Sequence, residues 1–482
     1  MIEGVRERMV EAIRLRLRAD VPIGIYLSGG IDSSVVAGIV TELIRKEHVK
    51  LGSESTSRVA CFSVKFPDES GYDESGTYKT ISSQLPHEGF VTDIPSPSDI
   101  ADRTARWLGV ETFKVTVDEQ RLADDFIDAA YHCEHHHLDL NSVAKFALST
   151  LPREHGVKVV LTGEGSDEHF TGYTWFPVEF LRSPDGNMPD SVLAQDNELR
   201  ENLHKSVIDE MKKMWKAQGA VQYDLEDTDS EVATYANGNT MPGSMLALQA
   251  PSIIYQNWVH DQYKGKWDMR EVVMKAHSTE VREKMRNKWH PAHTAMYMWN
   301  KSNLVNIILA AMGDRAEMAH SIEARTPFLD HHLAEYVNSL PPSVKLHYQP
   351  PEENRADAVD NFWWKSAGSV LWTMTEKWIL REAAKPFITD ELYKRRKVPF
   401  LAPVKWPKDG PIHKMFKDLL TREAVENLGF VNYGFVEKAL EIGFGDDANS
   451  GAFRVLCVTG AWVTLSQRFG IKKATVENSG WV

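Results

Sequence analysis

The segment from Leu27 to Ser34, Leu-Ser-Gly-Gly-Ile-Asp-Ser-Ser, constrains the fold more than any other part of this sequence. It follows a short apolar run at 23–27 that is typical of a strand, and it precedes apolar positions at helical spacing from Val35 to Leu43. Adjacent glycines allow the backbone to point successive amides at an anion, and the N-terminus of the following helix adds partial positive charge. The segment therefore predicts a strand, a turn that binds a polyphosphate, and a helix.

This turn differs from the phosphate loop of P-loop nucleoside triphosphatases, because no Gly-Lys-Ser/Thr follows its glycines at the required spacing. Asp32, at the start of the expected helix, is a candidate ligand for a magnesium ion that would offset the charge of the phosphates. The alternative is an ordinary tight turn in which Asp and Ser side chains cap a helix.

A second glycine-rich turn, Thr162 to Asp167, follows another apolar run. If both runs are strands of one parallel sheet, the two turns lie at the same edge, and Glu164 and Asp167 face the phosphates. Taken alone, this turn also fits a simple helix cap.

Strand-like and helix-like segments alternate through the first part of the chain, which predicts an α/β fold with a parallel sheet covered by helices on both faces. The further strand-like segments are 59–66, 113–117 and 157–162, and the helix-like ones include the first twenty residues, 74–85, 98–108 and 140–151. Beyond about residue 176 helical periodicity dominates. We expect a nucleotide-binding core at 1–175, a helical insertion or lid at 176–312, and a helical region at 313–482 that completes the active site.

Composition excludes several classes of protein. A formal net charge of -13 opposes a protein whose main task is to bind nucleic acid. Cys61, Cys133 and Cys457 lie far apart, which indicates buried, unpaired thiols in a reducing compartment. The N-terminus is too charged for a signal peptide, and no apolar run approaches the roughly 20 residues of a membrane helix. We expect a cytoplasmic protein without a nucleic-acid or membrane partner, and the oligomeric state, a homo-oligomer included, stays open.

Four motifs, in the same order along the chain, resemble the synthetase domain of glutamine-dependent asparagine synthetases and their β-lactam synthetase relatives. They are Leu27–Ser34, Leu161–Tyr173, Met318–Asp330 and Glu376–Arg381. The resemblance implies a PP-loop ATPase core of the adenine-nucleotide α-hydrolase type with a large C-terminal helical region. It also implies an AMP-forming ligase that uses ATP and Mg²⁺.

The resemblance further implies a role for each matched residue. The pyrophosphate of ATP would be bound by Ser28, Gly29, Gly30, Asp32, Ser33 and Ser34, the adenosine site lined by Leu27, Val64 and Gly163, and magnesium bound by Asp32 and Asp167. Lys377 would stabilise charge on the α-phosphate, and Glu164 would position or deprotonate the amine. In-line attack on phosphorus needs such cations, and the amine step needs a proton acceptor. Without the resemblance, Lys377 would be interpreted as an exposed helix lysine.

Two other groups of residues have structural interpretations. Arg325, beside Glu323, is expected mainly to brace the interface between domains. His132 and the run His135–His137 around Glu134 lack the helical spacing of metal ligands, so we expect a surface or substrate-pocket loop there.

The sequence departs from the family in three places. Ile2 stands where full-length members begin a glutaminase domain with a cysteine nucleophile. The segment Leu140–Lys145 lacks an arginine that compact asparagine synthetases carry, and the stretch between Tyr173 and Gly313 is longer than in those enzymes. The expected acid is nonetheless the β-carboxylate of aspartate, converted to asparagine with ammonia, which would be free or come from a separate glutaminase. The alternative is a specialised amide- or lactam-forming synthetase acting on another small-molecule acid and amine.

Two readings from other classes stay open. One is a catalytically inactive nucleotide-binding protein that regulates a full-length synthetase, although intact Asp32, Glu164, Asp167 and Lys377 oppose it. The other is a tRNA-modifying enzyme with the same type of loop, which the acidic charge and the lack of paired cysteines oppose.

Overall fold

The computed structural model describes residues 1–52, 59–67, 97–217, 252–263, 269–350, 369–397, 400 and 402–477. The helix expected at 74–85 lies outside these residues. The chain begins with helix α1 (Ile2–Arg16), and then forms strand β1 (Ile23–Tyr26), a turn and helix α2 (Ile31–Glu47). The strand, turn and helix expected around the first glycine motif are therefore present.

A five-stranded parallel sheet organises the core, in the order β3-β2-β1-β4-β5. Its other strands are β2 (Ala60–Lys65), β3 (Glu111–Thr116), β4 (Val159–Leu161) and β5 (Glu323–Arg325). Ile25 of the central strand β1 is in register with Cys61 of β2 on one side and with Leu161 of β4 on the other. Since β1 and β4 are parallel neighbours, the turns that follow them leave the same edge of the sheet.

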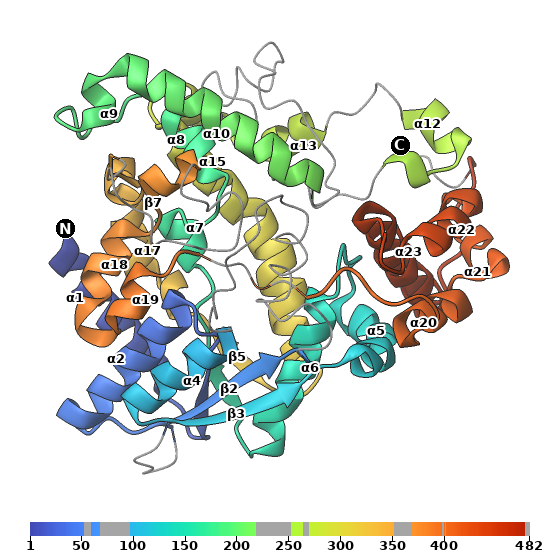
Figure 1. The fold of residues 1–482 in the computed structure, drawn as a ribbon, viewed down its shortest axis with the longest axis horizontal. Coiled ribbons are helices and arrows are strands. Elements are labelled where there is room, and N and C mark those ends of the chain that lie inside the picture. The colour runs from blue at the N-terminus through green and yellow to red at the C-terminus, as the bar shows by residue number, and fades with distance from the viewer. Residues whose placement is uncertain are drawn as a thin grey trace, which may run out of the picture.

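Helices cover both faces of this sheet, as Figure 1 shows for α2 and α4 on the near side. Ile23 and Ile25 of β1 point into an apolar cluster with Val35 and Val36 of α2, to which α1 and α4 (Pro97–Leu108) also contribute. Tyr26 and the neighbouring strands' Phe62 and Val160 point to the opposite face, against Leu148 and Leu151 of α6 (Asn141–Glu154). Alternate residues of β1 are thus buried on both sides, as expected of a strand inside a doubly covered parallel sheet.

The helices outside this layer form two groups, which occupy the top and the right of Figure 1. At the right, α5 (Glu119–Cys133) packs with α20 (Pro411–Leu419), α22 (Tyr433–Ile442) and α23 (Ser450–Phe469). At the top, α8 (Phe176–Leu181) packs with α10 (Asn197–Ala217) and α15 (Pro291–Trp299). The π-helix η4 (Asn300–Arg315) and α16 (Ala316–Met318) continue α15 down towards the sheet.

Short elements connect these groups to the edge of the sheet where the strands end. A two-stranded antiparallel sheet is formed by β6 (His347–Tyr348) and β7 (Met374–Thr375), and helix α18 (Trp378–Ala384) follows it. The remaining α-helices are α7 (Ser166–Phe170), α9 (Val192–Gln195), α12 (Asn257–Tyr263), α13 (Met269–Lys275), α14 (Thr279–Asn287), α17 (His331–Ser339), α19 (Asp390–Lys394) and α21 (Arg422–Glu426). Single 3₁₀ turns lie at Ser252–Ile254, Pro327–Leu329, Pro342–Val344, Val370–Thr373 and Lys385–Phe387.

The α/β fold expected from the sequence, a PP-loop type core with a large helical region, is confirmed. Its fifth strand was not expected, because Glu323–Arg325 lies in the part of the chain expected to be helical. The three cysteines are buried and unpaired, and burial raises the pKa of Cys61 and of Cys133 to about 12. No helix among the described residues has the length and apolar character needed to cross a bilayer.

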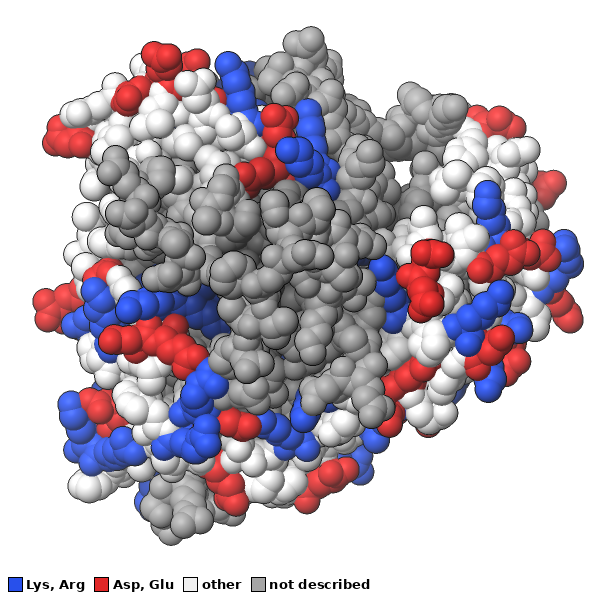
Figure 2. Space-filling model, viewed as in Figure 1, with Lys and Arg blue, Asp and Glu red and all other residues white. Residues whose placement is uncertain are grey.

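Charges of both signs cover the visible described surface. In Figure 2, Lys and Arg side chains are interspersed with Asp and Glu side chains over the lobe at the lower left, which holds the sheet, and over the lobe at the right. Several of these charges form exposed pairs, such as Arg103 with Glu391 and Arg468 with Asp128. Pairs of this kind contribute little to stability individually, so the charges of interest are those at the strand ends.

Candidate active site

The turn between β1 and α2 is held by its own serines. The backbone amide of Ser28 donates to Ser33 Oγ at 3.1 Å, and the two hydroxyl oxygens of these serines are also 3.1 Å apart. Gly29 has a φ of 73°, and Gly30 is the N-cap of α2. Ser34 is buried, and its hydroxyl has no hydrogen-bond partner among the described residues. The hydroxyl of Ser34 is thus a hydrogen-bond donor that no described residue uses, and it lies near the N-terminus of a 17-residue helix.

The turn after β4 lies directly against the first one. A β-carbon on Gly163 would come within 2.8 Å of Asp32 Cβ and 3.0 Å of the amide nitrogen of Ser33, so only glycine allows this approach. One turn later along the chain, Ser166 Oγ donates to Asp32 Oδ1 at 2.7 Å. The structure therefore brings together the two glycine-rich turns that the sequence places at the ends of two strands.

Lys377 reaches both turns. Its side chain is fully buried, and Nζ lies 2.7 Å from each carboxylate oxygen of Asp32 and 2.6 Å from Asp167 Oδ1. The residue is the N-cap of α18 and has a left-handed backbone conformation, with φ 57° and ψ 27°. Such a conformation is uncommon for a residue with a β-carbon, and it persists only where the surroundings impose it. This backbone conformation directs the ammonium group of Lys377 away from α18 and into the space between Asp32 and Asp167.

A glycine makes room for this contact. Gly172 follows α7, and a β-carbon there would lie 1.9 Å from Asp167 Oδ1 and 2.2 Å from Lys377 Cε. Any other residue at this position would push the carboxylate or the lysine away.

Lys397 is a second cation at the same carboxylate, and no motif in the sequence predicts it. Its Nζ lies 2.7 Å from Asp167 Oδ2, while Lys377 holds the other oxygen. Burial opposes the charge of Lys397, but Asp167 and Asp32 outweigh it and raise its pKa. Burial likewise opposes the charge of Asp167, but the two lysines outweigh it and lower its pKa. Asp167 and Lys397 therefore stabilise each other's charged forms.

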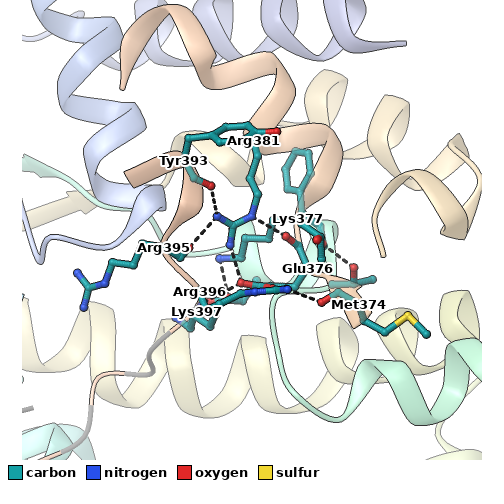
Figure 3. Close-up of polar contacts among 12 residues, drawn as sticks. Met374, Glu376, Lys377, Arg381, Tyr393, Arg395, Arg396 and Lys397 are labelled. Carbon is teal, nitrogen blue, oxygen red and sulfur yellow. Dashed lines mark hydrogen bonds and ion pairs between the residues drawn. The ribbon is translucent and has the colours of Figure 1, made fainter. Parts of the chain in front are cut away.

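A partly buried glutamate, Glu376, holds both lysine-bearing segments in place, as Figure 3 shows. Glu376 Oε1 accepts from Arg381 Nη2 at 2.5 Å and from the backbone amide of Lys397 at 2.8 Å, while Oε2 accepts from Arg396 Nη1 at 2.8 Å. Burial alone would raise the pKa of Glu376, but Arg381 and Arg396 lower it to about 2. Glu376 thus joins the start of α18 to the segment after α19.

The same segment is tied to the helix and to the first turn. Arg381, 2% exposed, donates through Nη1 to the carbonyl oxygens of Tyr393 and Arg395, each at 2.7 Å. Arg395 in turn donates through Nη1 to the carbonyl oxygen of Gly29. The run of basic residues that ends at Lys397 is therefore part of the site (Figure 3).

The other expected site residues lie around these charges. The side chain of Leu27 points into the core, and its backbone amide donates to the carbonyl of Phe62 at 2.9 Å. The backbone of Leu27, and not its side chain, therefore lies at the edge of the sheet. Val64 is half-buried near the end of β2. Glu164, at the tip of the second turn, is 38% exposed, and its Oε1 lies 3.2 Å from Lys145 Nζ.

Two groups of residues lie away from this cluster. Arg325 donates to the carbonyl oxygens of Arg16 and Arg18 at 2.9 and 2.8 Å, which ties the edge strand β5 to the end of α1. His137 is buried and pairs with Ser142 Oγ at 2.9 Å. In the described part of the chain, no group of three or more His, Cys, Asp or Glu residues is arranged to hold a metal ion.

Known proteins have sequences similar to this chain over most of its length. A family model described as asparagine synthase matches residues 4–462. Amidase chyE of Penicillium rubens is 38% identical over 481 residues, and amidase chry2 of Gibberella zeae is 37% identical over 479 residues. Each alignment covers 98% of this chain and 63% of the relative. A glutamine-hydrolyzing asparagine synthetase of Bacillus subtilis is 20% identical over 457 residues, which are 93% of this chain and 57% of that protein.

The chain spans less than two thirds of the length of these relatives. Within that span, the match with the family model includes both glycine-rich turns, the strands that carry them and the two lysine-bearing segments. The chain belongs to the asparagine synthase family.

Proposed function

We propose that this chain is an ATP-dependent ligase that adenylates a carboxylic acid, releases pyrophosphate, and transfers the acyl group to an amine with release of AMP. The observation that carries the proposal is the meeting of two strand-end turns on one buried ammonium group, with Lys377 Nζ within 2.7 Å of Asp32 and Asp167. The family supplies the rest of the case, because its members are ATP-dependent ligases.

The first turn is the proposed site of the pyrophosphate group of ATP. Its donors are the amides and hydroxyls of Ser28, Gly29, Gly30, Ser33 and Ser34, together with the N-terminus of α2. The adenosine part then lies over the backbone of Leu27 and Gly163, with Val64 at its side. This placement follows the general rule that ligands of open parallel sheets bind where the strands end.

Asp32 and Asp167 are the proposed magnesium ligands. Two carboxylates that converge on one cation fit the usual protein contribution to a magnesium–nucleotide site, in which phosphate oxygens and water complete the coordination. Bound there, the ion would neutralise part of the phosphate charge.

Lys377 and Lys397 are the proposed cations for the first chemical step. An oxygen of the acid attacks the α-phosphorus of ATP, the bond to the bridging oxygen of the β-phosphate breaks, and pyrophosphate leaves. Charge moves onto the phosphate oxygens during this step, and fixed ammonium groups stabilise it without having to reorganise. Lys377 would serve the α-phosphate, and Lys397, on the other oxygen of Asp167, would serve the leaving pyrophosphate.

Glu164 is the proposed base of the second step. The amine nitrogen attacks the acyl carbon, the acyl–oxygen bond to AMP breaks, and the amine proton passes to the carboxylate. Its position at the tip of the second turn, partly exposed, suits a group that meets a substrate from solvent.

The acid is a separate question, with two candidates. Family resemblance favours the β-carboxylate of aspartate, with asparagine as product and ammonia, free or from a separate glutaminase, as nucleophile. A specialised acid is favoured by the relatives named amidases, which match 98% of this chain at 37 and 38% identity. Lys145 also supports the second candidate, because it ends the segment where compact asparagine synthetases carry an arginine, and two glutamates already pair with it.

A screen for ATP–pyrophosphate exchange over the amino acids and simple aromatic and aliphatic acids tests the proposal, since exchange requires an acyl-adenylate. At least one acid should support exchange without an amine, and adding ammonium chloride or a simple amine should then release AMP and amide. Release of ADP and phosphate with every active acid would overturn it. So would nucleotide binding without exchange for any acid, which is the outcome expected of an inactive regulatory protein.

A further inference from the structure

A buried ion-pair cluster lies behind the proposed base, and the roles assigned above leave it unexplained. Lys145, on α6, places Nζ 3.2 Å from Glu164 Oε1 and 3.6 Å from Glu317 Oε1. The lysine side chain is 14% exposed, and that of Glu317, on α16, is 1% exposed. One ammonium group thus bridges a carboxylate at the site and a carboxylate inside the protein.

Glu317 is the least expected member of this cluster. Neither of its carboxylate oxygens has a hydrogen-bond partner among the described residues, and Lys145 is its ion-pair partner there. Burial raises the pKa of Glu317, and Lys145 opposes that shift. Burying a carboxylate with a single ion-pair partner is costly, which points to a role for Glu317 beyond packing.

Charge balance indicates what that function is. Burial opposes the charge of Lys145, but Glu164 and Glu317 outweigh it and raise the pKa of the lysine. The ring of Tyr26, 5.3 Å from Nζ, adds a further favourable contact. With Lys145 alone, the ammonium group would compensate the charge of Glu164. With Glu317 beneath the lysine, two carboxylates share one ammonium group.

We propose that Lys145 and Glu317 are positioning residues for the amine step. Lys145 fixes one oxygen of Glu164, so that the other oxygen faces the incoming nucleophile. Glu317 holds Lys145 from inside the protein and offsets its charge, which keeps the cluster attractive to an ammonium ion and able to accept its proton. This inference rests on the proposed function, because it assigns Glu164 to the transfer of the acyl group.

The test separates the two chemical steps in Glu317→Gln, Lys145→Met and Lys145→Arg. Each variant is assayed with an acid that supports exchange in the screen above, first for ATP–pyrophosphate exchange and then for amide formation against ammonium chloride concentration. We expect Glu317→Gln and Lys145→Met to lower amide formation by about 10- to 100-fold, with a raised Michaelis constant for ammonium, because a displaced base loses most of its effect. Exchange should change by less than about threefold, and Lys145→Arg should recover most of the amide formation.

Hydroxylamine sharpens the test, since it is uncharged near neutral pH and a strong nucleophile. In Glu317→Gln and Lys145→Met, hydroxamate formation should be affected less than amide formation. Glu164→Gln shows the largest loss of amide formation to expect, because it removes the base itself. Lys284→Met, which removes a lysine from an exposed pair with Glu280 on α14, is the matched control and should behave as wild type.

Several outcomes would overturn the inference. Unchanged amide formation in Glu317→Gln and Lys145→Met, with normal folding by thermal unfolding, would reduce the cluster to a structural one. A raised Michaelis constant for the acid in the exchange reaction would make Lys145 an acid-binding residue instead. Absence of exchange in the wild-type protein would overturn the proposed function itself, and is distinguishable because it does not depend on any variant.

Discussion

Two lysines near the carboxyl edge of the sheet are fully buried, and they differ in whether carboxylates lie beside the ammonium group. Lys377 Nζ lies among the carboxylate oxygens of Asp32 and Asp167, whereas Lys345 Nζ lies 3.4 Å from His293 Nε2 and 3.9 Å from Met296 Sδ. The two residues belong to adjoining segments, since the amide following Lys377 donates to the carbonyl of Lys345 at 3.0 Å.

Burial lowers the pKa of Lys345 to about 7, and Asp185 only partly opposes this shift. A lysine without a carboxylate partner loses its charge readily, and then offers nothing to a phosphate. The comparison teaches that burial alone does not make a phosphate-binding lysine. Lys377 instead has two carboxylate partners, which supply the negative charge that a buried ammonium group needs.

The largest effect that tests this contrast is expected from Lys377→Ala. The variant should lose about 10³-fold or more of the ATP–pyrophosphate exchange rate while still binding ATP, because it lacks the cation proposed to stabilise the transition state. Lys345→Met, the matched replacement of the other buried lysine, should retain exchange. Exchange near the wild-type rate in Lys377→Ala would show that the role proposed for this lysine is wrong.

A smaller effect is expected from Glu376→Gln, which keeps the shape of the glutamate but removes its charge. Arg381 and Arg396 would then be buried without a counter-ion, at a cost of about 2 to 3 kcal/mol in the free energy of unfolding. Because Lys397 is held by the same carboxylate, the Michaelis constant for ATP should also rise. Urea unfolding and exchange kinetics measure the two effects, and Glu382→Gln, on α18 in a partly exposed pair with Lys385, is the control.

The smallest effect, a gain in stability, is expected from Lys345→Met. The amine titrates near 10.5 in the unfolded chain and near 7 in the folded protein, so the unfolded chain binds more protons between these values. The stability of the wild-type protein therefore rises with pH across this window, and the penalty is largest below pH 7. Lys345→Met should gain about 1 to 2 kcal/mol at pH 6 and less at pH 9, measured by urea unfolding. An equal gain at both pH values would contradict an uncharged Lys345.

The central part of the site could be predicted from the sequence because it follows from local pattern. An apolar run, a glycine-rich turn and a helix identify each strand end, and parallel strands end at the same edge, so the proximity of Asp32 and Asp167 follows. Lys377 could be chosen only by its motif, since nothing in its local sequence distinguishes it from an exposed helix lysine.

Other parts of the site depend on contacts between distant segments, which periodicity does not reveal. Lys397 belongs to a basic run that alone is typical of solvated surface, and it is only partly exposed because Asp167 and Glu376 bind it. Lys145 and Glu317 are separated by more than 170 residues and meet because α6 and α16 pack together. Strand β5, with three residues, is too short to show an alternating pattern.

The left-handed turn of the backbone at Lys377 has a consequence for insertions and deletions. It directs the side chains of the consecutive residues Glu376 and Lys377 to different places. Glu376 is bound by two arginines, and Lys377 lies between the two strand-end turns. Deleting Lys377 would bring Glu376 to the N-cap of α18 and place a carboxylate beside Asp32 and Asp167. We therefore expect natural length variation in this family to spare this junction, however freely the surrounding loops differ.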